Sequence, residues 1–378
     1  MNILLITQLY PLTKESKVSP ALHYFVKVWA KQHHVQVIRL LLPNEKENLP
    51  DANPIIYDTV QIDIVKALWI PVIKKAIVNR TNVRNLITNI PDVIICHLYN
   101  SYFTFSYLKN DYRVPFIIGI HRSDVLLSHY IYHRYRIKKA IQKADLLVYR
   151  SEAVKINFEK YHHPSTRNFI AYSGVPENLV SRTREILLTP ESPSGIKKMI
   201  SACTLLKLKQ LDKVIIALHA LNNKGITWEY TIIGDGPEKQ NLEKLVEKLN
   251  LGSQVSFLGR LSREEVFNHM EKHTFFAMPS YNETFGLAFL EAMANGCIVI
   301  GAKGWGIDGL VNDGVNGSLC DPYNQEDINY KIYSALTMDN KRFAEMRKNS
   351  LLTVSNCSDE IMAEKYLNVI KECTKIQI

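Results

Sequence analysis

Short apolar segments alternate with longer amphipathic segments along almost the whole chain. The short segments are rich in Val, Ile, Leu and Phe without polar alternation, which is typical of strands buried on both faces of a parallel sheet. They are expected at 2–7, 35–41, 92–97, 116–121, 146–151, 169–173, 198–203, 230–234, 255–259, 275–280, 297–301 and 317–321. The segments between them show helical periodicity, so the chain is predicted to be an α/β protein.

A polar segment at 181–197, with two prolines and three serines, interrupts this alternation. It predicts a linker between an N-terminal domain at 1–180 and a C-terminal domain at 198–355. The segment 356–378 predicts a helix that packs back toward the N-terminal domain. We expect two doubly wound, Rossmann-like domains that face a cleft, with ligands beyond the carboxyl ends of the strands.

Composition narrows the class of protein. No run approaches the roughly 18 apolar residues of a membrane helix, and the N-terminus is expected to be a strand and not a signal peptide. The six cysteines lack paired spacing, which favours reduced thiols in the cytoplasm. The net charge of +9 from 46 basic and 37 acidic residues would suit nucleic acid, an anionic membrane or phosphorylated ligands.

The basic residues are concentrated in two stretches that also carry aromatic residues, 66–84 and 128–143. The first predicts a helix lying on an anionic membrane surface, with an ordinary solvated helix face as the alternative. Its basic and aromatic residues are Lys66, Trp69, Lys74, Lys75, Arg80 and Arg84. No nucleic-acid-binding motif is visible, so we expect no nucleic-acid partner.

The stretch 282–296, "NETFGLAFLEAMANG", places a lone carboxylate, Glu291, in an apolar helix pattern. A buried carboxylate needs a partner, either an arginine or lysine in an ion pair or ligand hydroxyls such as those of a ribose. Glu283 lies eight residues earlier, before a helix start predicted at Thr284, Phe285 and Gly286. The free N–H groups at this helix start would face an anion. The alternative for Glu283 is that it only stabilises the helix, as an acidic residue near the positive end of the helix dipole.

The segment 279–322, "PSYNETFGLAFLEAMANGCIVIGAKGWGIDGLVNDGVNGSLCDP", resembles the donor-binding segment of the retaining glycosyltransferases of family 4, which have the GT-B fold. The similarity is dense over this segment and extends more loosely to "TIIGDGPEKQNL", "FLGRLSREEV" and "ILLITQLYP", so it covers the whole chain, strongly in 198–330 and weakly in 1–180. It implies sugar transfer from a UDP- or GDP-sugar to a hydroxyl of a glycan or lipid-diphosphate-linked acceptor, with retention, as in bacterial surface-polysaccharide synthesis.

The resemblance assigns roles to the C-terminal domain. It implies that Glu291 binds the ribose and that Glu283 lies by the transferred sugar and the diphosphate. Backbone amides of Thr284, Phe285, Gly286 and Leu287 would hold phosphate and sugar hydroxyls.

The family's basic pair, G-R-L-x-x-x-K-G, is only half present in "ACTLLKLKQ". Lys209 falls on the lysine, but Thr204 stands at the arginine position. Lys207 is a candidate for part of the missing charge, which the leaving diphosphate needs. The alternative for both lysines is a solvated turn.

In the N-terminal domain, "GIHRSD" resembles the family's H-G-x-D segment. His121 would hydrogen-bond the sugar or orient the reacting groups, and Asp124 would be its neighbour. Arg122 would narrow the site or reach an acceptor phosphate. A structural histidine is the alternative. The first loop lacks the family's Gly-Gly pair, for which Ser19 is a weak substitute, and Gly309 holds a position that is often acidic, with Asp308 before it.

The resemblance and the residues together predict the chemistry. The leaving phosphate is expected to take the acceptor proton in a front-face substitution. No Asp-x-Asp or His/Cys ligand cluster is visible, so we expect no metal and no cofactor besides the sugar nucleotide. A sugar-nucleotide epimerase of the same fold is the first alternative and a basic nucleic-acid-binding protein the second. A dinucleotide oxidoreductase is disfavoured because G-x-G-x-x-G is missing after the first strand.

Overall fold

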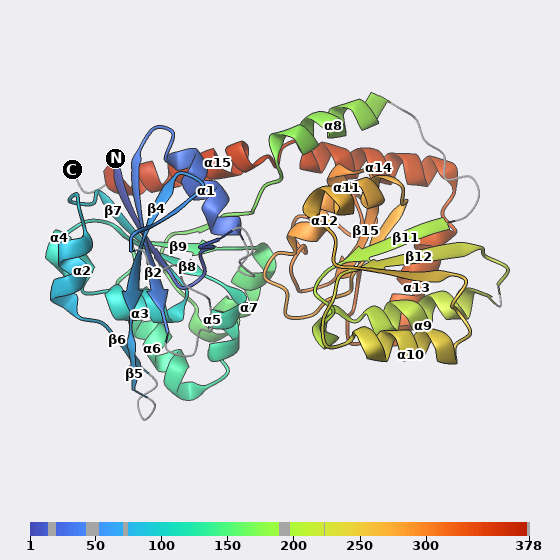
Figure 1. The fold of residues 1–378 in the computed structure, drawn as a ribbon, viewed down its shortest axis with the longest axis horizontal. Helices are drawn as coiled ribbons and strands as arrows, with labels where there is room; N and C mark the ends of the chain where they lie inside the picture. Colours follow the sequence, from blue (N-terminus) through green and yellow to red (C-terminus); the bar gives the residue numbers. More distant parts are fainter. Residues whose placement is uncertain (14–19, 43–52, 71–74, 189–196, 223, 376–378) are drawn as a thin grey trace. The chain divides into compact units, whose positions relative to one another are not determined.

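The structure is a computed structural model that describes residues 1–13, 20–42, 53–70, 75–188, 197–222 and 224–375. The chain forms two compact units, each a mainly parallel sheet with helices on both faces (Figure 1). The first unit contains Met1–Arg150, Val154–Ser173 and Asp359–Ile378, and the second contains Ser151–Ala153 and Gly174–Ser358. The predicted α/β class with two Rossmann-like domains is therefore confirmed.

The first unit has an eight-stranded sheet in the order β10-β9-β8-β7-β1-β2-β4-β3, parallel except for the β3–β4 pair. Its strands are β1 (Asn2–Thr7), β2 (His34–Leu41), β3 (Ile55–Tyr57), β4 (Val60–Lys66), β7 (Val93–His97), β8 (Phe116–Ile120), β9 (Leu146–Tyr149) and β10 (Asn168–Ile170). Its helices are α1 (Ala21–Trp29), α2 (Arg80–Leu86), α3 (Tyr99–Phe105), α4 (Leu108–Tyr112), α5 (Arg122–Leu127), α6 (Ile131–Ile141), α7 (Glu152–His162), which begins on residues of the second unit, and α15 (Asp359–Lys375).

The second unit has a six-stranded parallel sheet in the order β13-β12-β11-β14-β15-β16. Its strands are β11 (Lys197–Ala202), β12 (Trp228–Ile233), β13 (Val255–Gly259), β14 (Phe275–Ala277), β15 (Ile298–Ala302) and β16 (Ser318–Cys320). Its helices are α8 (Glu177–Leu188), the 3-10 turn η1 (Lys207–Lys209), α9 (Leu211–Asn222), α10 (Lys239–Lys248), α11 (Arg263–Glu271), α12 (Leu287–Ala294), α13 (Gln325–Leu336) and α14 (Asn340–Val354).

All twelve expected strands are present, with ends shifted by up to three residues. Their side chains are buried because helices cover both faces, as in the fully buried strands β7 and β8. The sequence reasoning missed β3 and β4, which extend this sheet, and the separate hairpin of β5 (Leu68–Ile70) and β6 (Lys75–Ile77).

The helix expected across 66–84 is wrong. Its described part before Asn79 contains the end of β4 and the paired strands β5 and β6, because β-branched residues such as Ile70 and Ile77 favour strands over a helix. A helix begins only at Arg80, where Asn79 Oδ1 accepts hydrogen bonds from the N–H groups of Thr81 and Asn82. Lys74 lies outside the described residues.

The linker expected at 181–197 is wrong over 181–188, which are the last turns of α8. This helix is amphipathic, and it packs against α12 and α14. Thr183 is fully buried, and its hydroxyl donates a hydrogen bond of 3.2 Å to the carbonyl of Ala294. The linker is also wrong at Lys197, which is the first residue of β11, and 189–196 lie outside the described residues, as does Ser19.

Helix α15 packs against α1 in the first unit. Trp29 Nε1 donates a hydrogen bond of 2.9 Å to the carbonyl of Ala363, and the buried Tyr366 ring contacts Phe25, Trp29 and Phe169. The last helix of the chain thus completes the core of its first unit. Among the described residues, no helix has the length and apolarity needed to cross a membrane.

Candidate functional site

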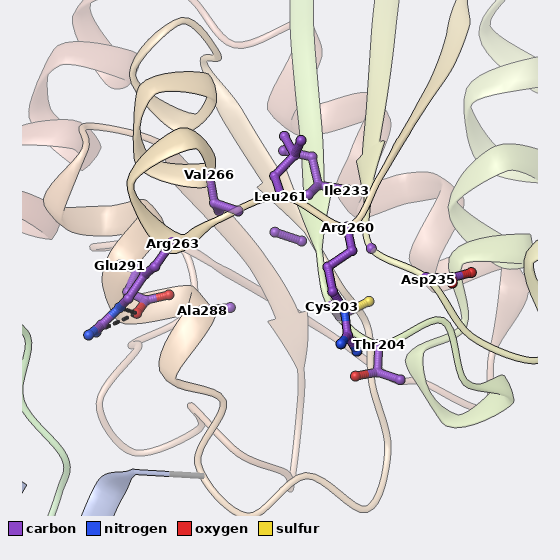
Figure 2. Close-up of a pocket in the computed structure, with 12 residues that line it drawn as sticks. Cys203, Thr204, Ile233, Asp235, Arg260, Leu261, Arg263, Val266, Ala288 and Glu291 are labelled. Carbon is purple, nitrogen blue, oxygen red and sulfur yellow. Dashed lines mark hydrogen bonds and ion pairs between the residues drawn. The ribbon is translucent and has the colours of Figure 1, made fainter. Parts of the chain in front are cut away.

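A pocket of about 250 Å³ lies at the carboxyl edge of the second unit's sheet (Figure 2). Its wall comes from the ends of β11, β12 and β13 and from helices α11 and α12. Gly234 directly follows β12 with φ 134°, and a Cβ there would lie 1.8 Å from the carbonyl oxygen of Cys203. Only glycine therefore lets the two strand ends close up at this point. The lining residues are Ala202, Cys203, Thr204, Ile233, Gly234, Asp235, Arg260, Leu261, Arg263, Val266, Ala288 and Glu291.

Glu291 lies in the pocket wall and is paired with an arginine. Its Oε1 lies 2.8 Å from Nε and 2.7 Å from Nη2 of Arg263, which is at the start of α11. Burial raises the pKa of Glu291, and the charge of Arg263 opposes this shift. Of the two partners considered from the sequence, the structure has the cationic side chain. Both contacts are made to Oε1, and Oε2 accepts no hydrogen bond from a described residue, so the carboxylate can still accept a ligand hydroxyl.

The helix start predicted at 284–286 is wrong, because α12 begins at Leu287. Gly286 is its N-cap with φ 82°, and a Cβ there would lie 2.7 Å from Cδ2 of Phe289. Thr284 precedes the helix and Phe285 is buried. The first amides of α12 are therefore presented by a left-handed glycine turn at the end of this loop.

Glu283 is held in this loop by an ion pair with Lys209 of η1. Its Oε1 accepts a hydrogen bond of 3.2 Å from the N–H of Thr284. Gly306 packs directly against it, since a Cβ at Gly306 would lie 2.8 Å from Glu283 Cγ. The structure thus brings together two predicted site residues that are 74 positions apart.

Two other predicted donor-binding residues differ in their placement. Thr204 lines the pocket. Lys207, by contrast, has a side chain that is 67% exposed and forms an ion pair of 2.9 Å with Asp212. The structure does not place Lys207 in the pocket wall.

Gly309 stands at the position that is often acidic in the family, and its backbone conformation explains why a glycine is present. Gly309 has φ 98°, a conformation that other residues rarely adopt. The neighbouring Asp308 accepts a hydrogen bond of 2.5 Å from the N–H of Gly304 and so closes the turn of its own loop.

In the first unit, His121 follows β8 and caps α5. Its N–H donates to Asp124 Oδ2 at 2.7 Å, and Tyr102 donates to Asp124 Oδ1 at 3.1 Å. Burial raises the pKa of Asp124 to about 7, against the opposing effect of these hydrogen bonds. Asp124 is therefore the predicted neighbour of His121, and it contacts the backbone of this residue. Arg122 is half-buried in the first turn of α5.

The ring of His121 pairs with a second histidine that the sequence reasoning missed. Nε2 of His121 lies 2.9 Å from Nδ1 of His97, and burial lowers the pKa of both, that of His121 to about 3. Gly119 makes room for the pair, because a Cβ there would lie 2.0 Å from His97 Nδ1. Both rings are neutral near pH 7, and one ring nitrogen of His121 is already used.

Arg150 was also missed, although it follows β9 at the same edge of the sheet. It is buried, and it donates to the carbonyl of Ala171 at 2.7 Å and to Ser173 Oγ at 2.6 Å. Its charge contributes to the lowered pKa of His121. His97 and Arg150 could have been predicted from the sequence, because each is a polar residue at the end of an apolar strand, in "IICH" and "LVYR".

Two family models match the chain. "Glycosyl transferases group 1" matches residues 185–351, and "Glycosyltransferase Family 4" matches residues 19–179. An uncharacterized glycosyltransferase of Methanocaldococcus jannaschii is 31% identical over 62% of either chain. The alpha-monoglucosyldiacylglycerol synthase of Streptococcus pneumoniae is 23% identical over 61% of this chain and 55% of its own. These matches span less than two thirds of either relative's length.

Solved structures share the whole architecture. HepE of Anabaena in complex with UDP has a TM-score of 0.71 at 17% identity, covering 98% of this chain and 100% of its own. The lipopolysaccharide outer core galactosyltransferase WaaB has a TM-score of 0.76 at 16% identity, covering 98% of this chain and 99% of its own. At these identities the likeness shows the fold. The two family models, which together span most of the chain, show that it belongs to the family 4 glycosyltransferases, and the solved structures show that it has the GT-B fold.

Proposed function

We propose that the protein transfers a sugar from a nucleoside diphosphate sugar to an acceptor hydroxyl. The observation that carries this proposal is the carboxylate of Glu291, which lines a pocket at a sheet edge and keeps one oxygen without a hydrogen bond from a described residue. A carboxylate that accepts hydroxyl hydrogen bonds is the usual ribose contact in such sheets. UDP and UDP-glucose are present in structures of the neighbour HepE, which supports UDP over GDP as the first donor to test.

In this proposal Glu291 binds the ribose diol, and Lys209 with the first amides of α12 binds the diphosphate. As the sugar–phosphate bond breaks, negative charge grows on the leaving oxygen, and a fixed cation stabilises it. Glu283 holds Lys209 in place and lies beside the transferred sugar. We propose retention, with the leaving phosphate taking the acceptor proton, and no requirement for a metal.

The acceptor side is proposed to involve His121, Arg122 and Asp124 of the first unit. A glycan or lipid-diphosphate-linked acceptor in polysaccharide synthesis is the class that we propose, on the cytoplasmic side of a membrane. The name of the Streptococcus pneumoniae relative, a synthase of a glycolipid, supports an acceptor with a lipid part.

Helix α6 supports contact with an anionic membrane surface. Tyr130, Ile131, Tyr132 and Tyr135 at its N-terminal end are 66%, 82%, 50% and 59% exposed, and lysines occupy its last turn. Exposed tyrosines with nearby basic residues suit a headgroup layer. Flotation with liposomes that contain anionic lipid should carry the protein upward at low salt. Equal flotation with neutral liposomes would count against an anionic surface, and no flotation with either liposome would indicate an ordinary solvated face.

A thermal-shift screen against UDP, GDP, ADP and CDP tests the donor. One nucleotide at about 100 times its Kd should add about 2.7 kcal/mol to the stability. Glu291→Gln should remove most of this shift if the carboxylate binds ribose. If Glu291 only pairs with Arg263, the substitution lowers the melting temperature of the free protein and leaves the shift intact.

Turnover assays test the reaction itself. With donor and acceptor, the sugar should appear on the acceptor with retained anomeric configuration, and EDTA should not change the rate. Donor incubated alone should stay unchanged apart from slow hydrolysis. An isomerised sugar in that incubation would indicate an epimerase of the same fold instead.

A further inference from the structure

Most cations around the donor pocket already have a carboxylate partner. Lys209 pairs with Glu283, Arg263 with Glu291, and Lys207 with Asp212. Each of these pairs is close to neutral, so none contributes a whole positive charge to an incoming diphosphate. The resemblance places an arginine at position 204, where this chain has threonine. The pocket therefore needs another source of uncompensated charge.

Arg260 is a second arginine in the pocket wall. It directly follows β13, and its exposed side chain makes no hydrogen bond or ion pair with a described residue. In Figure 2 this side chain extends across the pocket, and its guanidinium end lies toward Cys203 and Thr204.

The backbone of the neighbouring strand leaves space for this reach. β12 lies between β13 and β11, and it is followed by Gly234, which has no side chain that could stand between Arg260 and Thr204. Asp235 is the next residue and lines the pocket too. Its carboxylate accepts a hydrogen bond of 2.9 Å from the N–H of Gly236, and in Figure 2 it points away from Arg260.

We propose that Arg260 binds the diphosphate of the nucleotide and takes the place of the arginine that is missing at position 204. The inference rests on the proposed function, because it assumes a nucleoside diphosphate in this pocket. A guanidinium suits this role, since its planar set of donors can bind two phosphate oxygens at once. The rival role is stacking of the guanidinium on the nucleobase, which would not depend on the phosphates.

Isothermal titration of the nucleoside diphosphate that binds most tightly among UDP, GDP, ADP and CDP tests this assignment. Arg260→Ala should weaken its binding about 10- to 100-fold, the usual effect of losing charge-assisted hydrogen bonds. Arg260→Lys, which keeps the charge, should give an intermediate affinity. The double variant Arg260→Ala/Thr204→Arg should recover much of the loss, because it restores the arginine at the family's position.

Arg342→Ala is the matched control, since it removes an exposed arginine of the same unit outside this pocket wall. It should bind the nucleotide like the wild type. An Arg260→Lys variant as weak as Arg260→Ala, with an equal loss for the free nucleoside, would show nucleobase stacking and overturn the inference. Unchanged binding by Arg260→Ala would also overturn it while leaving the proposed function intact. If the wild type binds none of the four nucleotides, the proposed function fails and this inference fails with it.

Discussion

At the residue scale, Glu291 must combine burial with charge. Arg263 contacts one of its oxygens and offsets part of the cost of burying the carboxylate, although burial still raises its pKa above that of an ordinary glutamate. The protonated form, which accepts ribose hydrogen bonds less well, therefore becomes populated at a higher pH than usual.

We expect the affinity for the nucleoside diphosphate to fall more steeply with decreasing pH in the wild type than in Glu291→Gln. The glutamine variant starts weaker and has no proton to gain at this position, so its curve reports only the titration of the ligand's own phosphate, near pH 6. Isothermal titration between pH 5 and 8 measures both curves. Parallel curves would mean that Glu291 does not contact the ligand.

The titration of Asp124 affects the stability of the first unit, whereas that of Glu291 affects ligand binding. The pKa of Asp124 rises from 3.8 to about 7 because the carboxyl group is buried, so the folded protein holds a proton that the unfolded chain has already released. The stability contributed by this group is present below pH 4 and is lost as the pH rises to about 7.

Asp124→Asn should remove this dependence. The stability of the variant relative to the wild type should increase by about 1 kcal/mol for each pH unit between 4 and 7. Urea unfolding at several pH values measures it. A difference that stays constant over this range would show that the pKa of Asp124 is ordinary.

The sequence predicted the individual site residues better than their partners. Glu291 stood out because an apolar helix pattern surrounds it, and Lys209 because it matches a motif. Their ion pairs, Glu291 with Arg263 and Glu283 with Lys209, join separate elements 28 and 74 residues apart. Such pairs depend on tertiary packing, which no local pattern encodes. Arg263 lies within the family-like segment "FLGRLSREEV", but nothing in that segment indicates its pairing with Glu291.

At the element scale, the start of α12 depends on Gly286. Its φ is 82°, and a Cβ added there would lie only 2.7 Å from Phe289 Cδ2, so the turn has no room for a side chain. The turn determines where the first amides of the helix point, and the proposal uses these amides to bind phosphate.

Gly286→Ala should destabilise the second unit by about 1–3 kcal/mol and weaken nucleotide binding. Gly252→Ala is the control, because a Cβ at Gly252 meets no atom within 4 Å and its φ is not in the left-handed range. Thermal unfolding and titration with the nucleotide measure both effects. Wild-type behaviour of Gly286→Ala would show that the loop adapts without moving the helix start.

Elements with a strong apolar pattern were predicted correctly, whereas segments that combine features of two kinds of structure were not. Each apolar run that was expected to be a strand is one, because strands buried on both faces of a parallel sheet consist of such runs. The prolines and serines after 188 suggest a linker, but the residues 181–188 themselves have the apolar spacing of an amphipathic helix. In β5 and β6 two signals compete, because the basic and aromatic residues suggest a surface helix whereas the β-branched residues favour strands.

At the scale of the whole molecule, the two units are not consecutive in the sequence, because the first unit contains residues from both ends of the chain. The chain leaves the first unit at Ser173, builds the second unit, and returns at Asp359 with α15. Tyr366 on this helix is buried against Phe25 and Trp29 of α1, and its hydroxyl lies 3.4 Å from Nε2 of His97. The last helix therefore supports the strand ends that hold the candidate acceptor-side residues.

We expect Tyr366→Ala to destabilise the first unit by about 3–5 kcal/mol, the usual cost of removing a large buried aromatic ring. Nucleotide binding should persist, because every residue of the donor pocket belongs to the second unit. Hydrogen exchange should show faster exchange in β7 and β8 and unchanged protection in β11 and β12. Tyr330→Ala on α13, where the side chain is 63% exposed, is the control and should alter neither set of strands. If Tyr366→Ala reduced protection equally in both sheets, the two units would unfold as one, and the C-terminal helix would stabilise the whole molecule instead of the first unit alone.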